Sequence, residues 1–362
     1  MAQGVPPLKI FQAAVSLRNR LLRLIGRMVP PEVNIFEHAW GMWRTQMVAT
    51  AARLRLADLL AGGPKTLAEL AAEAGAHPES LERLLRALRS WGFFEQRKDG
   101  RYALNRAAEP LRTGVAGSMR DLAIFAGSKS MVLAWAHLEE AVRTGQSGYQ
   151  AAFGGSYWDG LRNDPEASKV FDGAMLAVTS LDVPVIASGF DFSRHATVCD
   201  VAGGVGTLLA GILERYPKLT GAVFDAPAVE GRARDFMRQR GLETRAQVIA
   251  GDFFEAVPVG FDVYLLRNIL HDWDDQGAAR ILAVVRRAMK PGAVLLISEM
   301  VLVEGASDPF VGKMLDLNMM ALLGGKERSP AQFGRLLGEG GFRLVKVHPM
   351  ASPNSLVEAA AA

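Results

Sequence analysis

The most informative stretch of this chain is TVCDVAGGVGTLLAGILERYP, residues 197–217. An apolar run ends at Asp200, glycines follow at Gly203, Gly204 and Gly206, and a helical segment with apolar periodicity then begins. Glycines let the backbone approach a ligand where a side chain would collide. The third glycine of the dinucleotide fingerprint GxGxxG is absent, and an acid stands ahead of the glycines. The stretch therefore predicts a strand, a ligand loop and a helix, with an acid suited to an ammonium or hydroxyl donor.

Apolar runs and amphipathic segments alternate through the C-terminal half. The runs cover residues 197–201, 221–224, 246–249, 263–266 and 294–298. This alternation is typical of an α/β fold, a doubly wound and mostly parallel sheet with helices on both faces. The second run ends at Asp225, which is placed to bind ribose hydroxyls, and the third at Asp252 and Phe253, which could contact an adenine. With the incomplete fingerprint, this order of signals favours S-adenosylmethionine over a nicotinamide cofactor.

The first 112 residues have a different texture. Residues 32–62 predict a helix, Thr66 and Glu69 form a capping box before a short helix, and a second helix begins near Pro78. A turn at residues 98–100 then predicts a hairpin, which completes a winged-helix pattern. Winged helices often bind DNA, but the second helix mixes acidic and basic residues, which favours a dimerisation module. Residues 115–185 predict a helical linker that breaks at Pro184 and Gly189.

Composition excludes several classes of protein. The 362 residues are 49% hydrophobic and 22% charged, with a net charge of +3, which is ordinary for a soluble protein and too weakly basic to indicate nucleic-acid binding. A single cysteine, Cys199, allows no internal disulfide framework and no zinc finger, and it favours the cytoplasm. Since no apolar run reaches eighteen residues, we expect no transmembrane helix.

The N-terminal 30 residues carry five basic and no acidic residues. This pattern allows a transit peptide or a membrane-surface helix. The alternative is a helical arm whose apolar residues pack on the body of the protein or on a partner subunit. No small-residue cleavage site follows an apolar core, so the pattern favours the arm.

Five motifs together resemble one family, the small-molecule O-methyltransferases that include plant caffeate and acetylserotonin enzymes and bacterial polyketide-tailoring enzymes. They are DVAGGVG (200–206), FDAPAV (224–229), GDFFEAVP (251–258), YLLRNILHDWDD (264–275) and GGKERS (324–329). The resemblance covers nearly the whole chain. It implies a Rossmann-like methyltransferase domain, a homodimer formed through the N-terminal domain, and S-adenosylmethionine as methyl donor.

The resemblance also assigns site residues. The cofactor-binding set that we expect is Asp200, Gly203, Gly204, Gly206, Asp225, Asp252, Phe253 and Arg267. His271 matches the catalytic base, and Glu299 and Glu327 match the two carboxylates around that histidine. Two positions depart from the pattern. Ala202 replaces the first of three glycines, which is tolerable if its backbone angles are ordinary, and Arg267 replaces a lysine near the cofactor carboxylate, which keeps the charge and changes the geometry.

The chemistry at His271 follows from proton transfer. A phenol, with a pKa near ~10, is protonated at neutral pH, and a neutral imidazole can accept its proton as the oxygen attacks a methyl group. The position of His271 ahead of a helix N-terminus favours the neutral imidazole. A carboxylate on the other ring nitrogen would fix the tautomer.

Aromatic and methionine side chains predict a flat apolar acceptor pocket. The residues that we expect there are Tyr157, Trp158, Phe171, Met175, Asp272, Met319 and Met320. No histidine or acidic cluster has the spacing of metal ligands, so no metal is expected.

We therefore predict an O-methyltransferase that acts on an aromatic or polyketide-like small molecule. Residues 1–112 form the arm and dimerisation domain, and residues 113–362 form the helical linker and the cofactor domain. The alternatives are N-methylation, a cofactor-dependent hydroxylation or decarboxylation on the same fold, and a winged-helix DNA-binding regulator.

Overall fold

The computed structural model describes residues 5–303 and 311–362. The chain divides into two compact units, which are described separately. The first, here called the sheet unit, comprises residues 1–22, 134–157 and 179–362. The second, the helical unit, comprises residues 23–133 and 158–178.

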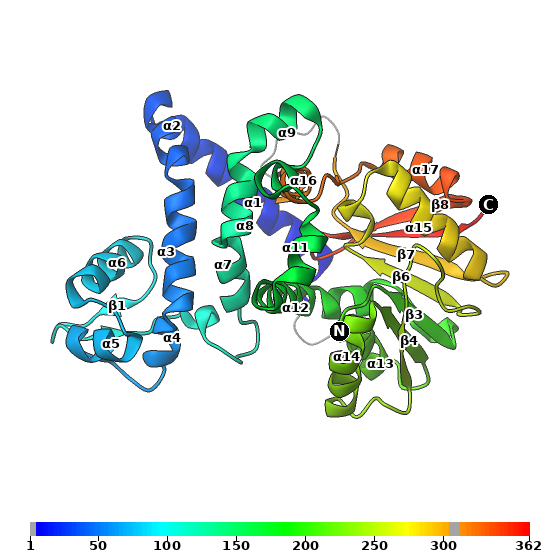
Figure 1. The fold of residues 1–362 in the computed structure, drawn as a ribbon, viewed down its shortest axis with the longest axis horizontal. Helices are drawn as coiled ribbons and strands as arrows, with labels where there is room; N and C mark the ends of the chain where they lie inside the picture. The colour runs from blue at the N-terminus through cyan, green and yellow to red at the C-terminus, as the bar shows by residue number, and fades with distance from the viewer. Residues whose placement is uncertain (1–4, 304–310) are drawn as a thin grey trace. The chain divides into compact units, whose positions relative to one another are not determined.

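A seven-stranded sheet organises the described part of the sheet unit (Figure 1). Its strands are β3 (Thr197–Val201), β4 (Thr220–Asp225), β5 (Ala246–Ala250), β6 (Val263–Arg267), β7 (Val294–Glu299), β8 (Phe342–Pro349) and β9 (Ser355–Ala361). The order is β5-β4-β3-β6-β7-β9-β8, with β3 to β7 parallel and β9 antiparallel to both β7 and β8. The five apolar runs are therefore the five parallel strands, and the doubly wound sheet is confirmed.

Alternate residues of the strands enter two different cores. Cys199, Tyr264 and Leu266 pack in one cluster with helices α15 (Asp275–Ala288) and α17 (Pro330–Glu339). Val198 and Leu265 pack in the other cluster with α13 (Thr207–Arg215). Because side chains of a strand alternate between faces, strands covered by helices on both sides are apolar at nearly every position. Helix α14 (Pro227–Gln239) connects β4 to β5.

The order of the strands also locates a ligand site. The chain runs outward from β3 to β4 and β5, and then returns to the other side of β3 with β6. Ligands of such sheets bind outside the carboxyl ends of the strands at this switch point. Asp225, Arg267 and Glu299 are the last residues of β4, β6 and β7, and Asp200 is the last but one of β3.

The helical unit contains the winged-helix pattern. Its elements are α2 (Pro31–Ala39), α3 (Gly41–Arg53), α4 (Leu56–Leu59), α5 (Leu67–Ala74), α6 (Pro78–Ser90), β1 (Glu95–Gln96), β2 (Tyr102–Ala103), η1 (Glu109–Leu111) and α7 (Arg120–Ala126). Both halves of the capping box form between Thr66 and Glu69. The helical prediction over 32–62 is confirmed as three successive helices, because the chain turns at Trp40 and again at Arg55, whose φ is +56°.

Further helices lead from the helical unit to the sheet. They are α8 (Lys129–Ala136), α9 (Leu138–Thr144), α10 (Gly148–Phe153), α11 (Tyr157–Asn163), α12 (Pro165–Gly189) and η2 (Phe192–Arg194). The remaining elements are η3 (Leu270–Asp272) and α16 (Val311–Leu322). The predicted break at Pro184 is wrong, because α12 continues through Pro184 to Gly189. Val185, Ile186 and Ala187 are buried in the core, which offsets the roughly 3 kcal/mol that an interior proline costs.

Within the described residues, α12 is one helix that is long and apolar enough to cross a membrane by length and composition. The core helix of a soluble protein meets the same criterion, so this is weak support for a membrane span. Asp182 on this helix forms a buried ion pair with Arg267 inside the sheet unit.

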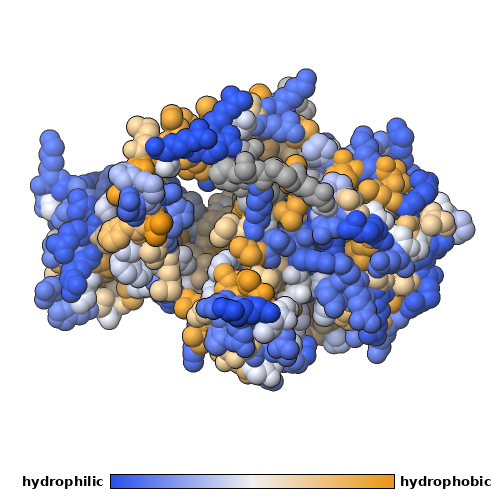
Figure 2. Space-filling view, turned by 90° about the horizontal axis from the view of Figure 1, so that it is seen from above, coloured by the Kyte–Doolittle hydropathy of each residue, from blue (hydrophilic) through white to orange (hydrophobic). Residues whose placement is uncertain are grey.

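Helix α1 (Leu8–Met28) is the predicted N-terminal arm. Its apolar side chains are exposed rather than packed on the body: Leu17, Leu21, Leu24, Ile25 and Met28 are all at least half exposed. Figure 2 shows hydrophobic residues reaching the surface among hydrophilic ones on the face that it views. The prediction that these side chains pack on the body of the protein is therefore not met.

Candidate active site

His271 lies in η3, a short 3-10 turn between β6 and α15, and it is buried. Its Nδ1 lies 2.7 Å from Oε1 of Glu327, which is also buried. Its Nε2 lies 3.3 Å from Oδ1 of Asp272. The GGKER loop and the HDWDD loop, which are about fifty residues apart in sequence, thus meet at one imidazole. Glu327 can hold the tautomer that leaves Nε2 to exchange a proton.

Glu299 reaches the backbone of the same turn and not the imidazole. Its Oε1 accepts hydrogen bonds from the N–H groups of Ile269, Leu270 and His271 at 3.2, 2.6 and 3.2 Å. Its Oε2 is buried and has no hydrogen-bond partner among the described residues. The two carboxylates that the sequence places around His271 therefore have different geometries: Glu327 contacts the ring, and Glu299 holds the main chain that carries it.

The electrostatics of this turn oppose the helix-dipole expectation. Burial by itself lowers the pKa of His271, but the charges of Asp272, Glu327 and Glu299 raise it, to about 9. Burial raises the pKa of Asp272 to about 7, against the lowering effect of His271. Burial also raises the pKa of Glu299. These three carboxylates therefore act on the imidazole in the direction opposite to that of the N-terminus of α15, which begins four residues later.

The glycine loop follows β3 as the sequence predicts. Asp225 at the end of β4 accepts a hydrogen bond at 2.7 Å from the backbone N–H of Gly204, so that the loop and the second strand are joined. A Cβ at Gly203 would lie 2.7 Å from the carboxylate of Asp200, whereas a Cβ at Gly204 would meet nothing within 4 Å. Gly204 therefore borders open space at the switch point, and Gly203 lets the chain pass Asp200.

Ala202 does not have ordinary backbone angles, which was the condition under which alanine was expected to replace glycine at this position without cost. Its φ is +55°, in the left-handed region that glycine adopts at no steric cost. Its N–H donates to the carbonyl of Phe224 at 2.7 Å, which holds this conformation in place. A residue with a side chain thus occupies a strained position at the start of the ligand loop.

Asp200 is buried, and its Oδ2 has no hydrogen-bond partner among the described residues. Burial and the charge of Asp225 raise its pKa to about 7, against the lowering effect of Arg267. An unpartnered carboxylate oxygen beside a loop with open space is what a ligand ammonium or hydroxyl would satisfy. S-adenosylmethionine carries both groups, so the residues present fit this cofactor.

Arg267 has partners inside the protein. Its guanidinium donates to Asp182 at 2.7 Å and to Thr179 at 2.9 Å, both from α12, while its buried Nε has no partner among the described residues. Ser352 and Asn354, from the connection between β8 and β9, donate to Asp182 as well. The predicted contact of Arg267 with a cofactor carboxylate therefore has to be made by a guanidinium that Asp182 already balances.

Asp252 and Phe253 lie after β5. Oδ1 of Asp252 accepts a hydrogen bond from the N–H of Phe254 at 2.8 Å, which shapes the turn. Phe253 is half-buried, with ring centroids 4.9 Å from Phe254 and 6.2 Å from Trp273. These contacts place an aromatic ring and an acid in the same turn beyond β5, and the contact of Asp252 and Phe253 with an adenine stays a prediction.

The residues predicted for the acceptor pocket divide between the two units. Tyr157, Asp272, Met319 and Met320 belong to the sheet unit, and Trp158, Phe171 and Met175 belong to the helical unit. Tyr157 packs against Tyr149, with ring centroids 5.2 Å apart. Trp158 and Phe171 form an edge-to-face pair at 5.8 Å.

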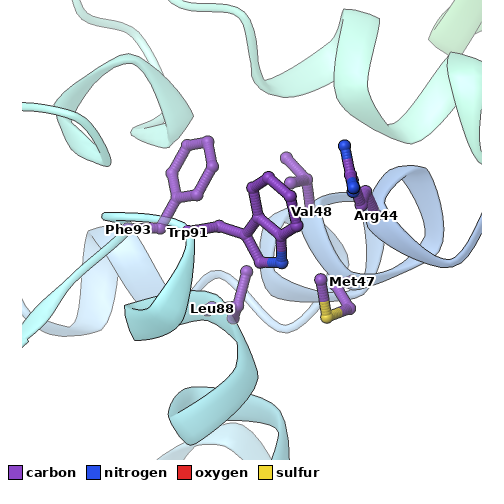
Figure 3. Close-up of a pocket in the computed structure, with 6 residues that line it drawn as sticks. All are labelled: Arg44, Met47, Val48, Leu88, Trp91 and Phe93. Carbon is purple, nitrogen blue, oxygen red and sulfur yellow. The ribbon is translucent and has the colours of Figure 1, made fainter. Parts of the chain in front are cut away.

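A separate pocket lies in the helical unit, with a volume of about 220 Å³ (Figure 3). It is lined by Arg44, Met47, Val48, Leu88, Trp91 and Phe93. The guanidinium of Arg44 lies 3.7 Å from the centre of the Trp91 ring. None of the predicted site residues lines it. Among the described residues, no group of three histidine, cysteine or acidic side chains could hold a metal ion.

The sequence reasoning missed several buried polar residues that support the site. Asp182, Asn354 and Arg328 each contact a strand end or the His271 turn through hydrogen bonds. Only Arg328 stood in a motif that the sequence analysis quoted. Asp182 and Asn354 come from segments without any motif, so only the fold could connect them with β6.

Two sequence models of protein families match the chain. The O-methyltransferase domain matches residues 135–343, and the O-methyltransferase dimerisation domain matches residues 36–113. The chain is 41% identical over 331 residues to a phenazine O-methyltransferase from Lysobacter antibioticus, covering 91% of this chain and 96% of the relative. It is 37% identical to a mitomycin biosynthesis 6-O-methyltransferase from Streptomyces lavendulae, covering 88% and 91%.

A solved structure adds the cofactor. An O-methyltransferase from neocarzinostatin biosynthesis, in complex with S-adenosylmethionine and 2-hydroxy-5-methyl naphthoic acid, superimposes with a TM-score of 0.76 at 38% identity, covering 88% of this chain and 96% of that one. With the family models, the relatives and the fit of the glycine loop, the chain belongs to the O-methyltransferase family and is an enzyme that uses S-adenosylmethionine as its methyl donor.

Proposed function

We propose that this enzyme methylates a hydroxyl group of an aromatic or polyketide-like small molecule, with His271 as the general base. The observation that carries the proposal is the buried His271–Glu327 pair, which leaves Nε2 as the ring nitrogen that can take a proton. Relatives named for phenazine and mitomycin, and a neighbour solved with a naphthoic acid, support an aromatic acceptor.

The division of labour follows from the geometry. Bound S-adenosylmethionine supplies a methyl group on a positively charged sulfur. Asp200, Gly203, Gly204, Gly206, Asp225, Asp252, Phe253 and Arg267 would hold it at the carboxyl ends of β3 to β6. His271 would accept the hydroxyl proton at Nε2, and Glu327 would stabilise the resulting imidazolium through Nδ1.

Asp272 has a second role in this proposal. Its carboxylate lies beside Nε2, so it borders the position from which the acceptor hydroxyl would donate its proton. With Tyr157, Met319 and Met320 of the same unit it would form part of the acceptor pocket, for which the sequence also predicts Trp158, Phe171 and Met175 of the helical unit. Methionine and aromatic walls suit a flat ring.

The assembly that we propose is a homodimer. The dimerisation model matches residues 36–113, and helices α1 and α2 expose apolar residues such as Leu24, Ile35 and Phe36. We retain 1–112 as the dimerisation part and 113–362 as the linker and cofactor domain, and we place the enzyme in the cytoplasm. Light scattering at several concentrations tests the dimer.

The deciding experiment uses aromatic hydroxy compounds with a labelled methyl donor. His271→Ala should lower kcat by roughly 10²–10⁴-fold, because a positioned base contributes about that much. The affinity for S-adenosylmethionine, measured by calorimetry, should stay nearly unchanged. In the matched variant Asp225→Ala the cofactor affinity should fall instead.

Three results would oppose the proposal. Full turnover by His271→Ala would exclude the general base. Formation of S-adenosylhomocysteine without an O-methylated product would favour N-methylation. Turnover of the acceptor without S-adenosylhomocysteine would favour hydroxylation or decarboxylation.

A further inference from the structure

Arg328 is the largest fully buried charged side chain among the described residues, and its hydrogen bonds converge on one turn. Its Nη1 donates to the carbonyl of Leu270 at 2.9 Å, and its Nη2 donates to the carbonyl of Trp273 at 3.0 Å. Its Nε donates to Oδ1 of Asp275 at 3.0 Å. The guanidinium therefore binds the residue before His271 and the residue two positions after it.

The N–H groups of the same turn are bound by Glu299. Its Oε1 accepts the N–H groups of Ile269, Leu270 and His271, while the N–H of Lys326 donates to the carbonyl of His271 at 2.9 Å. The main-chain groups of a tight turn must find partners when they are buried. Here the buried Glu299 carboxyl group accepts hydrogen bonds from N–H groups of the turn, and the buried Arg328 guanidinium donates hydrogen bonds to its carbonyl groups.

Neither charged side chain hydrogen-bonds the imidazole. The ring's nitrogens face Glu327 and Asp272, so Arg328 and Glu299 determine where the ring lies rather than what it touches. Arg328 also follows Glu327 directly in the chain. One side chain thus joins the loop that supplies the ring's carboxylate to the turn that supplies the ring.

We propose that Arg328 is a positioning residue for methyl transfer, which fixes the His271 turn so that Nε2 meets the acceptor hydroxyl. This inference rests on the proposed role of His271. The planar guanidinium donates in several fixed directions and spans two carbonyls and a carboxylate, whereas a lysine ammonium is a single point donor and cannot span them. A displacement of about 1 Å in a catalytic group can cost roughly 10²-fold in rate.

Arg245 provides a matched control. Its Nη1 donates to the carbonyls of Leu213, Tyr216, Pro217 and Leu219 at 3.0 to 3.3 Å, so it also ties a turn together through backbone oxygens. That turn joins α13 to the amino end of β4, opposite the carboxyl ends where the proposed site lies. It contains no proposed site residue. Arg245→Lys therefore removes a similar clamp without touching the His271 turn.

The test compares Arg328→Lys with Arg245→Lys in the full-length enzyme. We expect Arg328→Lys to lower kcat by roughly 10²-fold and to change the KM for S-adenosylmethionine by less than about threefold. Arg245→Lys should lower the melting temperature and leave kcat unchanged. Arg328→Lys introduced into the His271→Ala variant should have almost no further effect on kcat, since the effects of residues that act as a unit are not additive.

Several outcomes would overturn the inference. If Arg328→Lys lowers kcat equally in the wild-type enzyme and in the His271→Ala variant, Arg328 has only a structural role. If a folded Arg328→Lys enzyme keeps the wild-type kcat, Arg328 has no role in methyl transfer. Failure of the proposed function is seen separately, as full activity of His271→Ala alone. If Arg328→Lys does not fold, Asp275→Ala removes the carboxylate that fixes Nε. A several-fold lower kcat at an unchanged melting temperature then supports the inference, and an unchanged kcat contradicts it.

Discussion

The two units bury different kinds of residue. In the sheet unit the buried side chains include Asp182, Asp200, His271, Glu299, Glu327 and Arg328, all of them at or beside the carboxyl ends of the strands. In the described residues of the helical unit, every buried side chain is apolar, and the core consists of residues such as Leu56, Leu70, Leu81, Leu85 and Leu88. Burying a charged side chain costs free energy unless the charge is paired. Buried charged side chains are therefore expected where they bind a ligand or take part in the reaction. The difference therefore separates a unit built for stability from a unit that gives up stability for a site.

The largest expected effect is a loss of stability when the apolar core of the helical unit is disrupted. Leu85→Ala removes a fully buried side chain of α6 and should lower the free energy of unfolding by about 2–5 kcal/mol. The kcat per folded molecule should remain within about twofold of the wild type. Denaturant unfolding and steady-state kinetics measure the two quantities. The half-buried neighbour Leu84→Ala is the control and should lose less stability; an equal loss would show that the two positions pack alike.

The second prediction concerns the charged site. Glu327→Gln removes the negative charge at Nδ1 of His271, so it should lower kcat by roughly 10–100-fold, the value of a charge-assisted hydrogen bond. The wild-type pKa of about 9 means that the rate rises as the pH increases and the imidazole loses its proton. Without Glu327 the pKa falls, and the rising limb of the pH–rate profile should move to lower pH. A limb that stays in place would assign it to another group.

The same raised pKa has a consequence for stability. Because His271 binds its proton more tightly in the folded protein, its protonation stabilises the fold fully below pH 6.5, and this contribution is lost as the pH rises through about 9.

The third prediction exchanges stability for affinity. Asp200 has a pKa raised to about 7 from an ordinary value of 3.8, so its ionisation destabilises the fold progressively as the pH rises through that interval. Asp200→Asn should therefore raise the melting temperature at pH 8 and weaken S-adenosylmethionine binding by roughly 10–100-fold. Asp262→Asn is the contrast, because hydrogen bonds from Lys290, Ala196 and Thr197 outweigh burial and hold the pKa of that carboxyl at about 2. That variant should lose stability, and a gain of stability in both variants would contradict the argument from burial.

The smallest expected effect is at Ala202. Glycine adopts a φ of +55° without the roughly 1 kcal/mol that alanine incurs, so Ala202→Gly should stabilise the protein by up to about 1 kcal/mol. The melting temperature of the unliganded enzyme measures the change. A loss of stability would show that the freedom of glycine in the unfolded chain outweighs the relief of strain.

Sequence patterns predicted the sheet well because its signals are local. Each parallel strand is a short apolar run, and each is followed by a helix with its own periodicity, so the doubly wound order needed no long-range information. The break at Pro184 was wrong, and the turns that divide 32–62 into three helices were not predicted, for the opposite reason. A left-handed residue at Arg55 and the burial of Val185–Ala187 depend on contacts that local propensity does not contain.

The site divides in the same way. The types of residue at positions 200, 225, 267, 271, 299 and 327 were readable because they stand in, or at the end of, the motifs and apolar runs that resemble those of the O-methyltransferases. Their geometry was not readable. That Glu327 contacts the ring while Glu299 contacts the backbone depends on how β7 and the GGKER loop pack around η3.

By itself, the sequence determined the α/β class, the cofactor loop and the identity of the candidate base. The tertiary structure decided which carboxylates surround His271, the pairing of Arg267 with Asp182, and the place of Arg328 in the turn. The physical reason is that hydrogen bonds and charge interactions act over a few ångströms between groups that lie far apart in the chain. Apolar periodicity, in contrast, is written in neighbouring residues.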